Sequence, residues 1–180
     1  MSAQTVTTIE QLLAAGDSGR CELVRGDLVM MTPAGGEHGY VVMNLSVPLA
    51  LFVRQHRLGR VYGAETGFVL QRDPDTVRAP DAAFVRTDRL PVRRARGFVE
   101  GPPDLAVEVL SPDDRPAEVQ AKIDDYLEAG AQAVWTVDLD RRTLTIYRAD
   151  RGSRTLGIND VLDGEEYLPG FRLAIIEVFA

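Results

Sequence analysis

Glu108 is a charged residue in a segment that otherwise looks fully buried. It lies inside the run Leu105-Ala-Val-Glu-Val-Leu110, whose apolar residues on both faces indicate a strand in the middle of a sheet. An ionised carboxylate is costly to bury unless a cation, hydrogen bonds or a metal ion compensates it. Glu108 therefore indicates a functional site, although a strand-edge glutamate paired with an arginine would give the same pattern.

Lys122 is the only lysine of the chain, because 19 of the 20 basic residues are arginines. Its helical neighbours Val119, Ile123, Tyr126 and Leu127 form an apolar stripe. The ammonium group of Lys122 is thus expected on or beside the buried face of a helix. A lysine that merely extends from the edge of such a stripe into solvent is the alternative.

Asp81 follows Pro80 at the start of a predicted strand, a pair that is common in turns and gains weight only from Glu108 and Lys122. Two carboxylates on neighbouring strands, with a lysine beside them, are the groups needed for metal-assisted hydrolysis of a phosphodiester. Hard oxygen ligands suit Mg²⁺, and a lysine can orient or activate the attacking water. The short Ser111-Pro112 connection folds the following helix back against the strand, which makes contact between Lys122 and Glu108 geometrically plausible.

Three further polar residues are candidates for the same site. Glu22 opens a predicted hairpin and is either a supporting acid or an exposed residue. His38 begins a predicted helix, where its ring approaches a phosphate or orients a water, or else lies on the surface. Glu65 either lines the cleft or ends a strand. A zinc site has little support, because the chain has two histidines and one cysteine, Cys21.

The elements that must position these residues are both helices and strands. A capping box at Thr7 to Glu10 predicts a short helix that ends near Gly16. Apolar spacing predicts a helix over 37–57, with a kink at Pro48 and a stop at Gly59, and another from a cap at Asp114 to Gly130. Strands are predicted at Cys21 to Arg25, Leu28 to Met31, Arg60 to Ala64, Gly67 to Gln71, Ala79 to Val85, Leu105 to Leu110, Ala133 to Val137 and Thr143 to Arg148.

The connections and the ends complete the predicted organisation. Gly26-Asp27 is typical of the turn of a tight hairpin, and residues 86–103 are expected to be irregular. Short strands and a terminal helical turn are expected after Arg148. The absence of repeats and of low-complexity linkers predicts one mixed α/β domain over residues 1–180.

Composition limits the class of protein and its partners. The chain is 45% hydrophobic and 26% charged, as in ordinary globular proteins, and has no apolar run long enough to cross a bilayer. Residues 1–11 lack the features of a signal peptide, so a cytoplasmic location is expected. The formal charge of −7 argues mildly against a nucleic-acid partner. Two arginine clusters are candidates for a local basic patch, Arg93/Arg94/Arg96 and Arg54/Arg57/Arg60. The simpler interpretation of both clusters is a solvated surface.

Several motifs together resemble the bacterial Uma-two-type family of restriction-endonuclease-like domains, within the PD-(D/E)XK superfamily. Their order and spacing carry the resemblance, which covers nearly the whole chain. The motifs are Glu22-Leu-Val-Arg-Gly26, Glu37-His38, Arg78-Ala-Pro-Asp81, Pro103-Asp-Leu-Ala-Val-Glu-Val-Leu-Ser-Pro112, Lys122 before Tyr126-Leu-Glu-Ala-Gly130, Ala133-Val-Trp-Thr-Val-Asp138 and Leu168-Pro-Gly170.

The resemblance implies a restriction-endonuclease-like α/β fold, with a central mixed β-sheet flanked by helices and an N-terminal β-hairpin. It implies Asp81 and Glu108 as ligands of Mg²⁺, for which Mn²⁺ is an expected substitute. In the simplest superfamily pattern a lysine stands two residues after the acid, but this chain has Leu110 there. The catalytic lysine would instead be Lys122, with His38 or Glu22 assisting.

The expected activity is Mg²⁺-dependent hydrolysis of DNA by an endonuclease that uses water as nucleophile and acts as a homodimer. The main alternative is a catalytically inactive module of the same fold that binds nucleic acid or protein. The acidic net charge favours this alternative, and the retained acids and lysine oppose it. A hydrolase with a covalent nucleophile has weak support, because the sequence has no Gly-x-Ser-x-Gly motif and Cys21 has no evident base.

Overall fold

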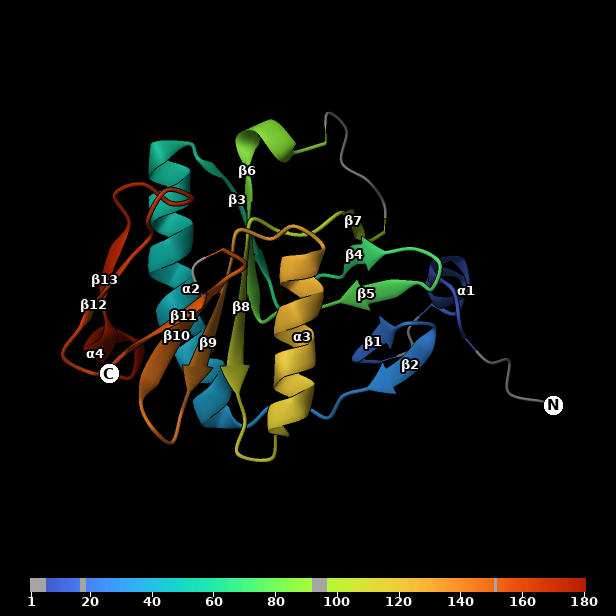
Figure 1. Cartoon of the computed structure of the whole chain (residues 1–180), viewed down its shortest axis with the longest axis horizontal. Helices are drawn as coiled ribbons and strands as arrows, with labels where there is room; N and C mark the ends of the chain where they lie inside the picture. Colours follow the sequence, from blue (N-terminus) through green and yellow to red (C-terminus); the bar gives the residue numbers. More distant parts are fainter. Residues whose placement is uncertain (1–5, 17–18, 92–96, 151) are drawn as a thin grey trace.

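A computed structural model of the chain describes residues 6–16, 19–91, 97–150 and 152–180. Its centre is a six-stranded mixed sheet in the order β11-β10-β9-β8-β6-β3, in which only β8 and β9 are parallel neighbours (Figure 1). The strands are β3 (Gly59–Gly63), β6 (Ala82–Arg86), β8 (Leu105–Leu110), β9 (Ala133–Asp138), β10 (Thr143–Arg148) and β11 (Gly152–Leu156). The strand that carries Glu108 is therefore central, as its apolar neighbours predict.

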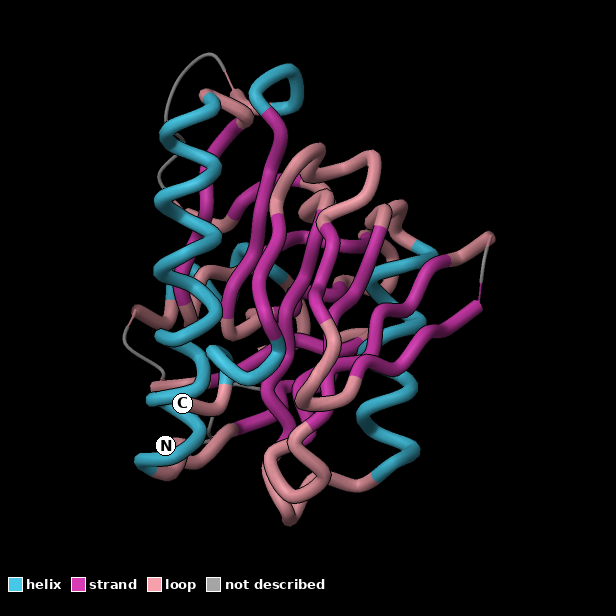
Figure 2. The backbone as a smooth tube through the Cα atoms, turned by 90° about the vertical axis from the view of Figure 1, so that its left-hand side faces the viewer, coloured by secondary structure: helices cyan, strands magenta, loops and turns pink. Residues whose placement is uncertain are grey.

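One long helix covers each face of this sheet. Figure 2 shows the strands between α2 (Gly36–His56) on the left and α3 (Pro116–Glu128) on the right. Alternation along β8 separates the two faces: Val107 packs in the core under α2, while Ala106 packs with Ile123 and Tyr126 of α3. Because Glu108 has the same parity as Ala106, its side chain belongs to the α3 side.

A second sheet lies beside the first and holds the N-terminal hairpin. Its five strands run in the order β2-β1-β5-β4-β7. They are β1 (Cys21–Val24), β2 (Asp27–Met30), β4 (Phe68–Gln71), β5 (Thr76–Arg78) and β7 (Val99–Glu100). The predicted hairpin is thus confirmed, but it is part of a larger sheet, and the sequence pattern missed β5 and β7. The latter, together with the 3-10 turn Thr87–Arg89, lies in the segment 86–103 expected to be irregular.

The C-terminal segment adds a hairpin of β12 (Val161–Asp163) and β13 (Arg172–Ala174), followed by α4 (Ile175–Val178). Its buried residues join the core under α2, which includes Trp135. The Trp135 indole donates a hydrogen bond to the Tyr167 hydroxyl at 2.9 Å. The short strands and the helical turn expected at this end are therefore present.

Several predicted boundaries are wrong by one or two residues. The capping box of α1 (Ile9–Ala14) is formed by Thr8 and Gln11, not by Thr7 and Glu10. The hairpin turn is Arg25-Gly26, because both adopt the positive φ that a two-residue turn requires.

The ends of the long helices also differ from the prediction. The α2 helix ends on Arg57 in the left-handed conformation, not at Gly59. Arg115 occupies the N-cap position of α3, while the Asp114 carboxylate accepts a hydrogen bond from the Ser111 amide. Within the described residues, no helix is both long and apolar enough to cross a bilayer.

Candidate active site

Two buried carboxylates lie side by side on neighbouring strands. The antiparallel register of β6 and β8 pairs Ala82 with Val107, so Asp81, immediately before β6, falls opposite Glu108. Both residues are 7% exposed. Asp81 Oδ2 accepts a hydrogen bond from the Val109 amide at 2.8 Å, which fixes its carboxylate against β8.

Lys122 reaches this pair from α3. Its Nζ lies 2.9 Å from Glu108 Oε2 and 3.2 Å from Glu22 Oε1. Tyr126, one helical turn further along the same face, donates a hydrogen bond from its hydroxyl to Glu108 Oε1 at 2.9 Å. The short connection after β8 thus places Lys122 and Tyr126 over the central strand, as the sequence predicted for Lys122.

Glu22 belongs to the cluster and is held by the second sheet. It is 2% exposed. One carboxylate oxygen accepts a hydrogen bond from Arg78 Nη1 at 2.8 Å, and the other accepts one from the Ala79 amide at 2.9 Å. Arg78 in turn donates from Nε to Asp125 of α3 at 2.9 Å. The alternative of an exposed hairpin glutamate is therefore wrong.

His38 approaches the cluster from the first turn of α2. Its Nε2 lies 3.4 Å from Asp81 Oδ2, and its side chain is 11% exposed. The hydrogen bond with Asp81 raises the pKa of His38, and contact with the Val109 backbone adds to this effect, although burial acts in the opposite direction. The five residues predicted for the site, Glu22, His38, Asp81, Glu108 and Lys122, are therefore brought together.

The cluster holds more negative than positive charge around Glu108. Burial raises the pKa of Glu108 to about 7 in spite of Lys122, and the charges of Asp81 and Glu22 contribute to the increase. Burial favours the neutral form of Lys122, but Glu108 and Glu22 outweigh it and raise the pKa of the ammonium above its usual value. Lys122 therefore stays cationic, whereas the charge of Glu108 is not fully compensated.

This donor set fits a magnesium ion. Among the described residues, no group of three or more His, Cys, Asp or Glu side chains is arranged to hold a metal ion. Mg²⁺ usually keeps several waters and takes one or two protein carboxylates, so the pair Asp81 and Glu108 is sufficient. Each oxygen of Glu108 has a lone pair beyond the one used by Lys122 or Tyr126. A divalent cation would also stabilise the ionised form of Glu108, whose pKa is raised.

Other sequence-predicted candidates lie elsewhere. Glu65 has a side chain 63% exposed, and its Oε1 lies 3.2 Å from Arg20 Nε, so it pairs away from the two central acids. Arg54 and Arg57 are at the opposite end of α2 from His38. The cluster Arg93/Arg94/Arg96 lies outside the described residues.

The sequence did not predict three polar residues of the site, which are Tyr126, Arg78 and Asp125. Tyr126 belongs to the predicted apolar stripe, yet its spacing of four from Lys122 on one helix face is a usable signal. Arg78 and Asp125 are both buried. Their pairing across 47 residues of sequence left no signal in local spacing.

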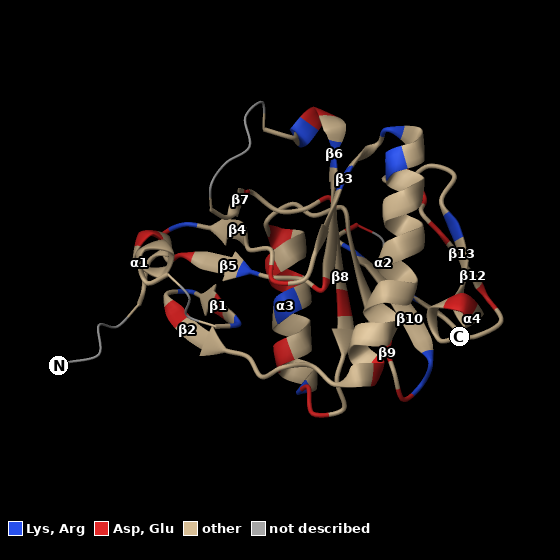
Figure 3. Ribbon diagram, turned by 180° about the vertical axis from the view of Figure 1, so that it is seen from behind, with Lys and Arg blue, Asp and Glu red and all other residues tan. Residues whose placement is uncertain are grey.

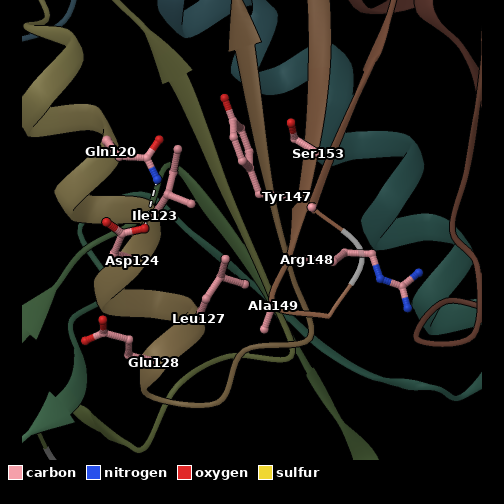
Figure 4. A pocket seen from close by; sticks show the side chains of 10 residues that line it. Gln120, Ile123, Asp124, Leu127, Glu128, Tyr147, Arg148, Ala149 and Ser153 are labelled. Carbon is pink, nitrogen blue, oxygen red and sulfur yellow. Dashed lines mark hydrogen bonds between the residues drawn. The ribbon is translucent and has the colours of Figure 1, made fainter.

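A separate groove of about 410 Å³ lies on the other flank of α3, between that helix and strands β10 and β11 (Figure 4). Its polar lining includes Gln120, Asp124 and Tyr147, and none of the five clustered residues lines it. Gln120 donates to Asp124 at 2.8 Å on the helix itself. This groove is therefore distinct from the charged cluster.

Comparison with known proteins identifies the fold and the family of the chain. The fold is similar to the crystal structure of a "putative nuclease belonging to DUF820" from Anabaena variabilis, with a TM-score of 0.82 and 21% identity over 96% of this chain and 97% of that one. A comparison with curated proteins gave no significant match. The model of the Uma2 family, described as "Putative restriction endonuclease", matches residues 6–176. The predicted restriction-endonuclease-like fold is confirmed, and the chain belongs to the Uma2 family.

Proposed function

We propose that this chain is a Mg²⁺-dependent DNA endonuclease, with Mn²⁺ as an accepted substitute. The observation that carries the proposal is the juxtaposition of Asp81 and Glu108 on neighbouring strands with the Lys122 ammonium 2.9 Å from Glu108. Two acids and a cationic lysine at this spacing suit the hydrolysis of a phosphodiester. Membership of the Uma2 family, described as "Putative restriction endonuclease", supports this class of substrate.

The roles of the residues follow from their contacts. Asp81 and Glu108 would hold the ion, which when bound supplies a water of lowered pKa and positive charge beside the phosphate. The Val109 amide orients Asp81, and Glu22 and Glu108 keep the Lys122 ammonium in place. Lys122 then donates hydrogen bonds to the attacking water or to the scissile phosphate and stabilises its developing charge. His38, beside Asp81, contacts the phosphate or the water.

Cutting of both strands of a duplex by one type of site is easiest for two copies of the chain. We therefore include a homodimer in the proposal. The two active sites of such a dimer would each cut one strand.

A nicking assay on supercoiled DNA tests this function. Wild type is expected to cut with Mg²⁺ or Mn²⁺ and to stop when the ion is chelated. Asp81→Asn, Glu108→Gln and Lys122→Met should each lower the rate by at least about a hundredfold. The first two remove a proposed ligand of the ion, and the third removes the cation that stabilises the charge developing on the phosphate. The matched control is Glu118→Gln on the exposed side of α3, which makes the same chemical change as Glu108→Gln away from the cluster.

Calorimetric titration with Mn²⁺ gives a second measurement that does not depend on activity. Wild type and Lys122→Met should bind the ion, whereas Asp81→Asn should not. Cutting that survives all three substitutions would assign the activity to another site or to a contaminant.

A catalytically inactive binding module remains the second candidate, favoured by the net charge of −7. Wild-type protein that neither cuts DNA nor binds Mn²⁺ would support this candidate and refute the nuclease.

A further inference from the structure

The outer face of α2 is apolar, although it points away from the protein core. The inner face packs in the core through residues four apart: Val41, Leu45, Leu49 and Val53. The opposite face exposes Tyr40, Met43, Val47 and Leu51, which are 58%, 56%, 44% and 62% exposed. A surface helix normally presents polar residues to solvent, and contiguous exposed apolar residues mark interaction surfaces.

The spacing of these residues gives one continuous stripe, called the α2 stripe below. Tyr40, Met43, Val47 and Leu51 follow one another at intervals of three and four residues, the pattern of a seam between two packed helices. The 21 residues of α2 include two charged side chains, Glu37 in the first turn and Arg54 in the last. Figure 3 shows α2 on the near side of the molecule, with basic residues at its upper end and tan ribbon along its middle.

The two charges suit a second copy of the same helix. Glu37 and Arg54 are 17 residues apart, about 26 Å along the helix, and bracket the α2 stripe. In an antiparallel pair with a two-fold axis between Leu45 and Ser46, Glu37 faces Arg54 of the second copy. In the same register Tyr40 faces Leu51 of the second copy, so apolar residues meet between the two charge pairs. Neither Glu37 nor Arg54 forms an ion pair with any described residue of its own chain.

We propose that the α2 stripe is the interface of a homodimer in which two α2 helices pack antiparallel about this two-fold axis. A two-fold interface requires a self-complementary surface, and an acidic first turn, an apolar middle and a basic last turn provide one. His38 lies in the first turn of the same helix. The two copies of His38 would therefore be about 22 Å apart along the helix axes. The interface specifies the homodimer of the proposed function, but its formation does not depend on any nuclease activity.

Sedimentation velocity without DNA or metal tests the interface. Wild type at about 10 µM should sediment as a dimer. Leu51→Glu should be a monomer at the same concentration, with a dimer dissociation constant raised by at least about a hundredfold, because it places a charge in the apolar contact with Tyr40 of the second copy. Val161→Glu is the matched control, since Val161 is a 41% exposed apolar residue of β12, and it should remain a dimer.

Charge reversal tests the antiparallel register. Glu37→Arg and Arg54→Glu should each weaken the dimer by about tenfold, because each creates two like-charge contacts. The double variant Glu37→Arg/Arg54→Glu should recover most of the affinity. Interaction of these charges with the helix dipole predicts the opposite order, with the double variant the least stable, so the recovery is specific to pairing between copies.

Circular dichroism would confirm that each variant is folded. A wild-type monomer at about 100 µM, or a Leu51→Glu variant that still dimerises, would overturn the proposal. A dimer in which the double charge reversal gives no recovery would overturn the antiparallel register. Wild-type protein that dimerises but neither cuts DNA nor binds Mn²⁺ would instead refute the proposed function and leave the interface intact.

Discussion

At the scale of single residues, the neighbours of Glu108 have opposing effects on the ionisation of its carboxyl group. Lys122 and Tyr126 stabilise its ionised form, whereas burial, Asp81 and Glu22 raise its pKa to about 7. An ionised carboxylate is costly to bury unless enough positive charge or hydrogen bonding compensates it. A cation bound beside Asp81 and Glu108 would therefore stabilise the ionised form of Glu108.

Glu22 is expected to act through Lys122. Its carboxylate lies 3.2 Å from the ammonium and is itself fixed by Arg78 and the Ala79 amide. Glu22→Gln should therefore loosen the lysine and lower the single-turnover nicking rate by about tenfold. Affinity for Mn²⁺, measured by calorimetry, should change little, because Glu22 is not one of the two acids proposed to hold the ion.

Glu22→Asp separates this positioning role from a structural one. The shorter acid keeps the charge but shifts the oxygens, so part of the lost rate should return if Glu22 works by holding the ammonium. A loss of Mn²⁺ binding in Glu22→Gln equal to that in Asp81→Asn would contradict the assignment.

At the scale of elements, the sequence predicted the parts that depend on local pattern. The central strand Leu105–Leu110 and the two long helices followed from apolar spacing and were found within one or two residues. Strands β5 and β7 were missed because they have three and two residues, too few for a periodic signal. Their pairing depends on distant partners, such as Val77 opposite Leu23. Asp81, Glu108 and Lys122 could be predicted because each lies in a segment with a clear local pattern. The Arg78–Asp125 pair could not, because its two residues are 47 positions apart in the sequence.

The Arg78–Asp125 pair connects α3 to the second sheet. Asp125 accepts hydrogen bonds from Arg78 of β5 and from Arg25 in the hairpin turn, and it is 8% exposed. Asp125→Ala leaves the buried Arg78 with only Glu22, so the free energy of unfolding should fall by about 3 kcal/mol, the usual cost of breaking a buried pair. Urea unfolding followed by circular dichroism would measure the loss.

The neighbouring acid provides the control for this measurement. Asp124 has the same side chain on an exposed position of the same helix and accepts a hydrogen bond from Gln120. Asp124→Ala should cost less than about 0.5 kcal/mol, because surface substitutions outside such networks have small effects. Equal losses in the two variants would show that the Arg78–Asp125 pair contributes nothing special to stability.

At the scale of the whole molecule, the charged cluster lies where the two sheets and both long helices meet. Glu22 comes from the second sheet, Asp81 and Glu108 from neighbouring strands of the main sheet, Lys122 from α3 and His38 from α2 (Figure 1). An active site at this junction requires the two sheets to hold their relative position. The buried contacts across the junction are ionic as well as apolar, so its geometry depends on several long-range pairs at once.

We therefore predict that the two sheets unfold as one cooperative unit. The chain carries one tryptophan, Trp135 in the main sheet, and one cysteine, Cys21 in the second sheet. Burial raises the pKa of the Cys21 thiol, with a contribution from Glu22, so the folded protein should react slowly with a thiol reagent. Trp135 fluorescence and pulsed labelling of Cys21 should then give the same urea midpoint. Labelling of Cys21 at a lower urea concentration than the fluorescence change would show that the second sheet opens first. In that event the Glu22 contact with Lys122 would be lost before the main sheet unfolds.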